Sequence, residues 1–306
     1  MKAKTKLDWK LQRNLLEKAA EEAETLLRAR PSQEIPIDPF DIVRSEGRRL
    51  RLFQEDFRNR FDGQLEYLPK VRRFVIYLNN KCDQGMPAGQ HHPRTRFSLS
   101  HELGHLYLEH HVAHLLRGGK PHHSKGEFEH EELIELEAES FAAALLMPRD
   151  QFGEQLNSEE PSLKLIAELA KTFETSAMAT LFRAVQVSDF PCAIVSVRDG
   201  QIGWRFTSTA LIDAGCYPPE RGPLKSKKAI EAWSAFQSGT KMNAEAYGQV
   251  HSWFRTYDKE DLLQVNVREE YLHLPWRTDL LVFLTISEQE LTDAQGDEDD
   301  SNDDED

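Results

Sequence analysis

His101, Glu102 and His105 follow the pattern His-Glu-x-x-His within the segment SLSHELGHLYLEHH. On the helix predicted from about Thr95 to Leu116, histidines four positions apart lie one turn apart, so both imidazoles can reach one metal ion. The glutamate after the first histidine then projects toward the open side of the metal, where it can act as a general base on a water molecule. These residues predict a zinc-dependent hydrolase centre, although a match of this length arises by chance in roughly one such chain in twenty.

A catalytic zinc of this type needs a third protein ligand, and a second helix predicted over about residues 131–146 can supply it. On a helical wheel of about 100° per residue, Glu137 is the only carboxylate of this helix within the apolar sector. A buried carboxylate is costly unless it is paired or bound to a metal. The wheel therefore predicts Glu137 as the third ligand, with a salt bridge to a buried arginine as the alternative. For His101 and His105 the alternative interpretation is a pair of exposed histidines on a helix, without a metal.

The residues around both helices carry a longer resemblance. RTRFSLSHELGHLYLEHH followed by ELEAESFAAALLMP resembles the ImmA/IrrE family of zinc metallo-endopeptidases, and RRFVIYLN resembles the family's strand ahead of the motif. The resemblance covers about residues 31–150 and becomes thinner afterwards. It implies one Zn²⁺ per chain, held by the two histidines and Glu137, with Glu102 as the catalytic residue. Glu139 departs from the family pattern, which has Asn or Asp there, so we expect different hydrogen bonds just outside the metal ligands.

The predicted strand ahead of the motif is a candidate for binding the substrate. A peptidase needs an extended stretch of its substrate in the cleft, and a strand edge can hold one through backbone hydrogen bonds. The candidate residues are Phe74, Val75, Ile76, Tyr77 and Leu78. The same apolar run fits an internal strand of the sheet equally well.

The whole chain of 306 residues predicts an α+β protein. A mostly helical, zincin-like metallopeptidase domain with a small sheet is followed by a helix-turn-helix-like segment and a C-terminal domain of mixed α/β character. A hairpin signal at Asp199-Gly200 lies near the start of that last domain, where longer family members carry a GAF-like sensor domain. The predicted parts are an N-terminal helix over 1–30, the peptidase domain over 31–150, the helical segment over 151–188, the C-terminal domain over 189–287 and a disordered acidic tail over 288–306.

The net charge of −14 is concentrated at the C-terminus. Residues 288–306 hold 11 acidic residues and no Lys or Arg, so the remaining chain has 38 basic and 41 acidic residues and a charge of −3. Such an acidic run predicts disorder. Scattered cysteines at Cys82, Cys192 and Cys216 fit a reducing compartment, and no apolar run approaches the length of a bilayer span. We therefore expect a cytoplasmic protein without a membrane partner.

The resemblance implies an endopeptidase that cleaves a helix-turn-helix transcriptional repressor and thereby induces a stress or mobile-element response. The alternative is a non-catalytic regulatory binding protein, such as an antirepressor or a toxin–antitoxin component, that retains the zinc site. Intact Glu102 argues against this alternative, because a structural site needs no general base. Direct DNA binding is disfavoured, since the second helix of residues 162–187 offers Thr180, Arg183 and Gln186 but no basic cluster.

Overall fold

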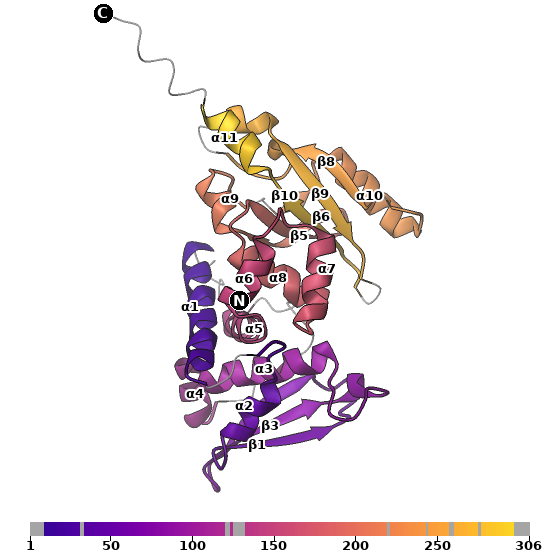
Figure 1. Cartoon of the computed structure of the whole chain (residues 1–306). Helices are drawn as coiled ribbons and strands as arrows, with labels where there is room; N and C mark the ends of the chain where they lie inside the picture. Colours follow the sequence, from indigo (N-terminus) through magenta and orange to yellow (C-terminus); the bar gives the residue numbers. More distant parts are fainter. Residues whose placement is uncertain are drawn as a thin grey trace, which may run out of the picture. The chain divides into compact units, whose positions relative to one another are not determined.

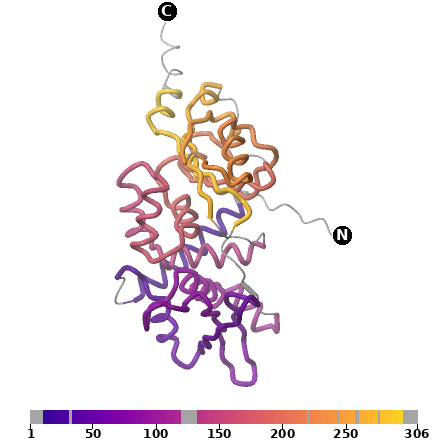
Figure 2. The backbone as a smooth tube through the Cα atoms, turned by 90° about the vertical axis from the view of Figure 1, so that its right-hand side faces the viewer, coloured from indigo at the N-terminus to yellow at the C-terminus, as the bar shows by residue number. Residues whose placement is uncertain are grey.

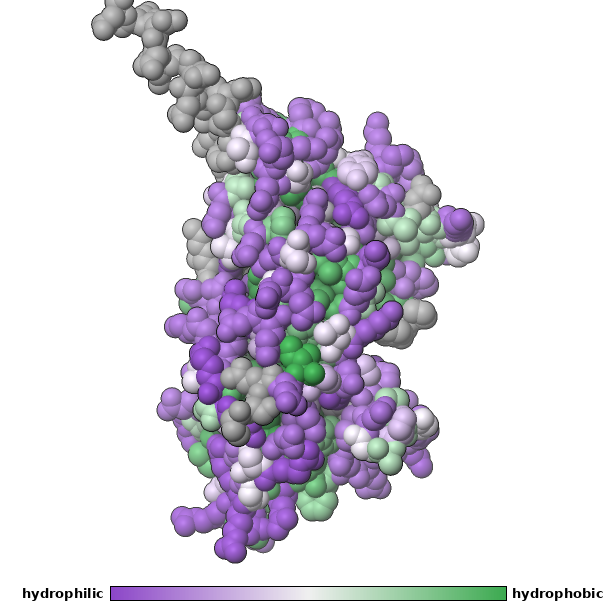
Figure 3. Space-filling model, viewed as in Figure 1, coloured by the Kyte–Doolittle hydropathy of each residue, from purple (hydrophilic) through white to green (hydrophobic). Residues whose placement is uncertain are grey.

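A computed structural model describes residues 9–30, 34–119, 123–124, 132–218, 221–242, 244–256, 260–274 and 277–296. The chain divides into two compact units, of residues 1–152 with 169–183 and of residues 153–168 with 184–306. Helices and strands occur in both units, so the fold is α+β as predicted (Figures 1 and 2). Within the described part of the chain, no helix combines the length and hydropathy needed to span a membrane. The face drawn in Figure 3 is mainly hydrophilic.

The first unit is a four-stranded sheet with helices. Its elements are α1 (Trp9–Arg28), α2 (Pro39–Ser45), β1 (Leu50–Glu55), β2 (Gly63–Leu68), β3 (Arg73–Asn79), a 3₁₀ turn at Lys81–Asp83, α3 (Pro93–Tyr107), α4 (Glu109–Leu116), β4 (His123–Ser124) and α5 (Leu133–Leu146). The strand order is β1-β3-β2-β4. Helix α3 packs on β2 and β3, and α5 packs on both α1 and α3 (Figure 1).

Strand β3 lies inside this sheet, which corrects the prediction that Phe74–Leu78 holds the substrate by its edge. It pairs in parallel with β1, where Leu50 lies opposite Phe74, and antiparallel with β2, where Gly63 lies opposite Leu78. Both hydrogen-bonding edges of β3 are therefore paired with neighbouring strands, and no edge is left for a substrate. Its consecutive apolar residues are those of an internal strand, because a strand covered on both faces does not alternate polar and apolar side chains.

The predicted helix over Thr95–Leu116 is two helices. Helix α3 begins at Pro93, after His92, whose Nδ1 accepts a hydrogen bond from the backbone N–H of Arg94 at 3.1 Å. It ends before Leu108, which has extended backbone angles of φ −72° and ψ 114°, and α4 starts at the next residue. This break changes the direction of the chain between the His-Glu-x-x-His motif and the two histidines that follow it.

Helix α1 is part of the same unit as the motif. Ser140 on α5 donates to the backbone oxygen of Leu16 at 2.7 Å. Arg183 is fully buried and donates to Glu24 Oε1 at 2.6 Å and to the backbone oxygen of Met147 at 2.9 Å. Burial lowers the pKa of Arg183 to about 10. These contacts tie α1 to the rest of the unit, so the N-terminal helix is not the separate part that is predicted for residues 1–30.

The helices after α5 occupy the segment predicted to be helix-turn-helix-like. They are α6 (Arg149–Leu156), α7 (Leu163–Thr172) and α8 (Ala177–Val187), and the boundary between the two units passes through this segment. The predicted turn after α7 is present, and Ser176 Oγ accepts from the backbone N–H of Ala179 at 3.0 Å, as expected of an N-cap.

The second unit contains a six-stranded antiparallel sheet. Its further elements are β5 (Cys192–Arg198), β6 (Gln201–Thr207), α9 (Thr209–Asp213), β7 (Gly222–Pro223), α10 (Lys227–Ser238), β8 (Glu245–Gln249), 3₁₀ turns at Val250–Ser252 and Asp261–Gln264, β9 (Asn266–Leu272), β10 (Leu280–Thr285) and α11 (Glu288–Gly296). The strand order is β7-β6-β5-β10-β9-β8. The predicted hairpin joins β5 to β6, with positive φ angles of 54° at Asp199 and 69° at Gly200. The GAF-like assignment of this unit stays a prediction.

The acidic C-terminal segment begins as a helix. Leu291 of α11 is 5% exposed and belongs to the apolar core of the second unit. Glu290 accepts from the backbone N–H of Asn266 at 2.9 Å. These contacts explain why residues 288–296 are helical, where the sequence analysis expects disorder; residues 297–306 of that predicted tail lie outside the described residues.

We expect Glu24→Ala to lower the free energy of unfolding by about 3 kcal/mol, because it leaves the buried guanidinium of Arg183 without its carboxylate partner. Chemical denaturation followed by circular dichroism measures this change. Glu21→Ala, at an exposed position of the same helix, serves as the control and should change stability by less than about 0.5 kcal/mol. Equal effects of the two substitutions would contradict the structural role of this ion pair.

Candidate metal centre

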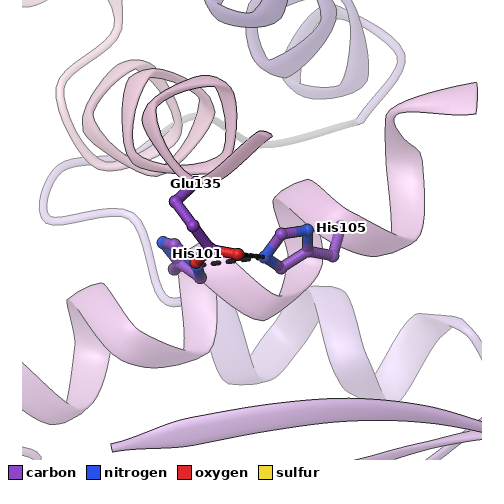
Figure 4. Close-up of side chains that lie close together, drawn as sticks. All are labelled: His101, His105 and Glu135. Atoms are coloured by element: carbon purple, nitrogen blue, oxygen red, sulfur yellow. Dashed lines mark hydrogen bonds and ion pairs between the residues drawn. The ribbon is translucent and has the colours of Figure 1, made fainter. Parts of the chain in front are cut away.

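His101 and His105 meet a carboxylate from α5 in the interior of the first unit (Figure 4). The two Nε2 atoms lie 3.1 Å apart. Glu135 Oε2 lies 3.2 Å from His101 Nε2, and Glu135 Oε1 lies 3.7 Å from His105 Nε2. All three residues are buried, with exposed fractions of 2%, 2% and 4%. The three residues are called the first centre below.

The donor atoms of the first centre fit a divalent transition metal. Imidazole nitrogens and a carboxylate oxygen are ligands of zinc, at about 2.0–2.2 Å from the ion. In a tetrahedral arrangement such ligand atoms lie roughly 3.3–3.5 Å from each other. The separations in the first centre, from 3.1 to 3.7 Å, agree with this requirement.

The structure places Glu137 elsewhere. Its Oε2 atom lies 3.0 Å from His110 Nε2 and 3.2 Å from His111 Nε2. Burial raises the pKa of Glu137, but hydrogen bonds with His111 and His110 outweigh it, so the pKa lies below its ordinary value. Burial lowers the pKa of His111 to about 4. The expected third ligand therefore faces a different pair of histidines, and Glu135 faces the pair of the motif.

The helical wheel separates these carboxylates poorly because α5 is buried on every side. Glu135, Glu137 and Glu139 have exposed fractions of 4%, 4% and 0%, so Glu137 is not the only carboxylate pointing inward. The glycine between His101 and His105 is the better signal. A Cβ atom on Gly104 would lie 3.2 Å from the backbone of Ala138, so the glycine allows α3 and α5 to approach closely at this alanine. Glu135 is one turn before that contact and therefore faces α3.

Glu102 is fully buried next to strand β2. A Cβ atom on Gly63, the first residue of β2, would lie 2.6 Å from Glu102 Oε1. A side chain at position 63 would overlap with the Glu102 carboxylate at this separation. Glycine therefore leaves the space that the carboxylate occupies. Gly63 was not predicted as a functional residue, because nothing in the local sequence around it connects it with the motif.

Comparisons with known proteins identify the family that part of the chain resembles. Residues 86–185 match the Peptidase_M78 family, described as the IrrE N-terminal-like domain, and they include both motif helices. This match confirms the resemblance to the ImmA/IrrE family, which implies a peptidase. A solved structure of a Mycobacterium tuberculosis transcriptional regulator is similar at 12% identity and a TM-score of 0.54, covering 92% of this chain and 81% of that chain. At this identity the similarity shows a shared fold. No curated protein gives a significant match.

We expect Gly63→Ala to lower peptide hydrolysis about 10- to 100-fold while leaving the metal content unchanged, because the added methyl group displaces the Glu102 carboxylate but none of the candidate ligands. Rates of peptide cleavage and metal analysis of the same preparation measure both quantities. Gly153→Ala is the matched control, since the nearest atom to its Cβ position is 3.9 Å away. Unchanged cleavage by the Gly63 variant would show that Glu102 does not need this space.

Proposed function

We propose that this protein is a zinc-dependent endopeptidase whose metal is held by His101, His105 and Glu135. The observation that carries the proposal is the convergence of these three buried side chains on one point, on the helix that also carries Glu102. Zinc bound there would polarise the scissile carbonyl and lower the pKa of a water molecule. Glu102 takes a proton from the attacking water and later delivers it to the leaving amine.

Glu102 favours catalysis over a purely structural metal site. The first centre already provides two imidazoles and a carboxylate without it. A fourth ionisable side chain, fully buried on the same helix, has a chemical use in a hydrolase as the group that moves the proton. A structural site, in contrast, needs only its ligands and the bonds that orient them.

We assign substrate binding to β2 in place of β3. Gly63 brings the start of β2 against Glu102, so a peptide along the outer edge of this strand would run toward the catalytic carboxylate. In the described residues, β4 pairs with β2 only at Gly63 and Gln64. An extended peptide would therefore add by backbone hydrogen bonds to the β2 edge beyond this pairing, from Leu65 to Leu68.

The substrate we propose is a helix-turn-helix transcriptional repressor, cut during a stress or mobile-element response. Resemblance to the ImmA/IrrE family supports this substrate class. The similar solved structure is named a transcriptional regulator, which agrees with a regulatory setting for the fold. A non-catalytic binding protein that retains its metal is the competing proposal.

Separate substitution of Glu135 and of Glu137 by glutamine identifies the third ligand. We expect Glu135→Gln to weaken zinc binding by more than about 100-fold, beyond the 10- to 100-fold typical of groups that only support a ligand. Glu137→Gln should keep the tight ion, because its carboxylate does not face His101 or His105. Metal content after dialysis against a weak chelator measures both variants. The reverse result would restore Glu137, as the helical wheel predicts.

The proposed reaction depends on Glu102. We expect Glu102→Gln to keep zinc and fold while slowing cleavage about 10²- to 10⁴-fold, since an amide cannot accept the proton. Mapping of new protein N-termini in cells that express either form, before and after stress, measures cleavage and identifies the substrate. Termini that depend on Glu102 support a selective peptidase. Their absence under several stresses, with zinc bound, would favour the binding protein.

A further inference from the structure

A second group of side chains with the same ligand chemistry lies beside the first centre. His110, His111 and Glu137 offer two imidazole nitrogens and a carboxylate oxygen, all within 4.8 Å of one another. Both Nε2 atoms lie within 3.2 Å of the single oxygen Oε2 of Glu137. These three residues are called the second centre below. We propose that the second centre binds a divalent transition metal and that its occupation weakens metal binding at the first centre.

The second centre is accessible and preformed. His111 and Glu137 are 1% and 4% exposed, so two of the three ligands are held by their surroundings. The side chain of His110 is 61% exposed, which provides a path for an ion from solvent. The break at Leu108 makes this arrangement possible, because α4 turns its first two histidines toward α5. Separations of 3.0 and 3.2 Å between ligand atoms require only a small expansion around an ion.

The two centres are joined by a hydrogen bond between His105 and His111, whose Nδ1 atoms lie 2.8 Å apart. Each neutral imidazole carries one proton, and a hydrogen bond between two ring nitrogens contains one of them. When His105 uses Nε2 for a metal, its own proton is on Nδ1 and is donated to His111. The proton of His111 is then on Nε2, where it faces Glu137 and prevents that nitrogen from acting as a ligand.

Binding at the second centre reverses this arrangement. His111 then uses Nε2 for the metal and donates its Nδ1 proton to His105. The proton of His105 moves to Nε2, which is the nitrogen that the first centre needs. The competition changes the tautomers and leaves the charge of both rings unchanged. By linkage, each ion weakens the other by the same factor, which we expect to be about 10- to 100-fold, the range found for partners of metal-binding histidines.

When a metal is bound at the first centre alone, the residues of the second centre have a different role, which is to orient His105. Glu137 and His111 form a chain of hydrogen bonds that ends on His105 and fixes its Nδ1–H tautomer. In excess metal, a second ion binds to Glu137 and His111 and disrupts these hydrogen bonds. The second ion does not rest on the proposed function. The competition rests on the metal proposed for the first centre, and inhibition of peptide cleavage by the second ion rests on the proposed peptidase activity.

Zinc titration of the full-length, tag-free protein by calorimetry and equilibrium dialysis tests the proposal. We expect wild type to bind two ions, the second more weakly. His110→Ala should bind one ion with the tight affinity. Glu137→Gln should do the same, because the amide oxygen of Gln can still accept the hydrogen bond from His111 Nε2 that fixes the tautomer of His105. Glu135→Gln should bind one ion, about 10- to 100-fold tighter than the weak ion of wild type, because competition is removed. His114→Ala, at an exposed position on the same helix, should behave as wild type.

Each outcome bears on a separate part of the proposal. A single ion in wild type, unaffected by His110→Ala and by Glu137→Gln, overturns the second centre. Equal affinity of the weak ion in wild type and in Glu135→Gln overturns the competition. Excess zinc should inhibit wild-type peptide cleavage and spare His110→Ala. Two bound ions without any cleavage at any zinc concentration would reject the proposed peptidase function and leave the second centre in place.

Discussion

The candidate site depends on the close approach of α3 and α5 at Gly104 and Ala138. The position of a Cβ on Gly104 lies 3.2 Å from the backbone of Ala138, so a side chain at 104 would push the helices apart. The ligand atoms of the first centre tolerate little displacement, since three of them must reach one ion at about 2 Å. A glycine in a helix interior costs roughly 1 kcal/mol relative to alanine. That cost is offset here by the packing of α5 and by the placement of its carboxylates.

The interior of the first unit is consequently unusual for a protein core. Glu102, Glu135, Glu137 and Glu139 are all buried, in the same region as His101, His105 and His111. Isolated charges in such a place would destabilise the fold, so each carboxylate needs a cation or a set of donors. Burial of this many ionisable groups is a property expected of a functional site, where pKa values and ligand geometry are adjusted.

The sequence predicted those parts of the structure that local patterns determine. The motif helix, the N-cap at Ser176 and the hairpin at Asp199-Gly200 each depend on residues close together in the chain. The third ligand depends on which side of α5 faces α3, and a helix buried all round carries no polar face to reveal this. The neighbours of β3 and the contact between Gly63 and Glu102 depend on residues far apart in sequence, for which spacing gives no signal.

Burial of a carboxylate is not by itself a sign of a metal site, as Glu269 in the second unit shows. This residue is fully buried, yet it accepts hydrogen bonds from Ser226 Oγ at 2.6 Å, Trp253 Nε1 at 2.8 Å and the Tyr271 hydroxyl. Neutral donors surround it, and the arrangement is structural. Glu135, in contrast, faces imidazole nitrogens that also face each other at 3.1 Å. Nitrogen lone pairs directed at one point, with a carboxylate beside them, are complementary to a cation, which is why we propose a metal at the first centre and not at Glu269.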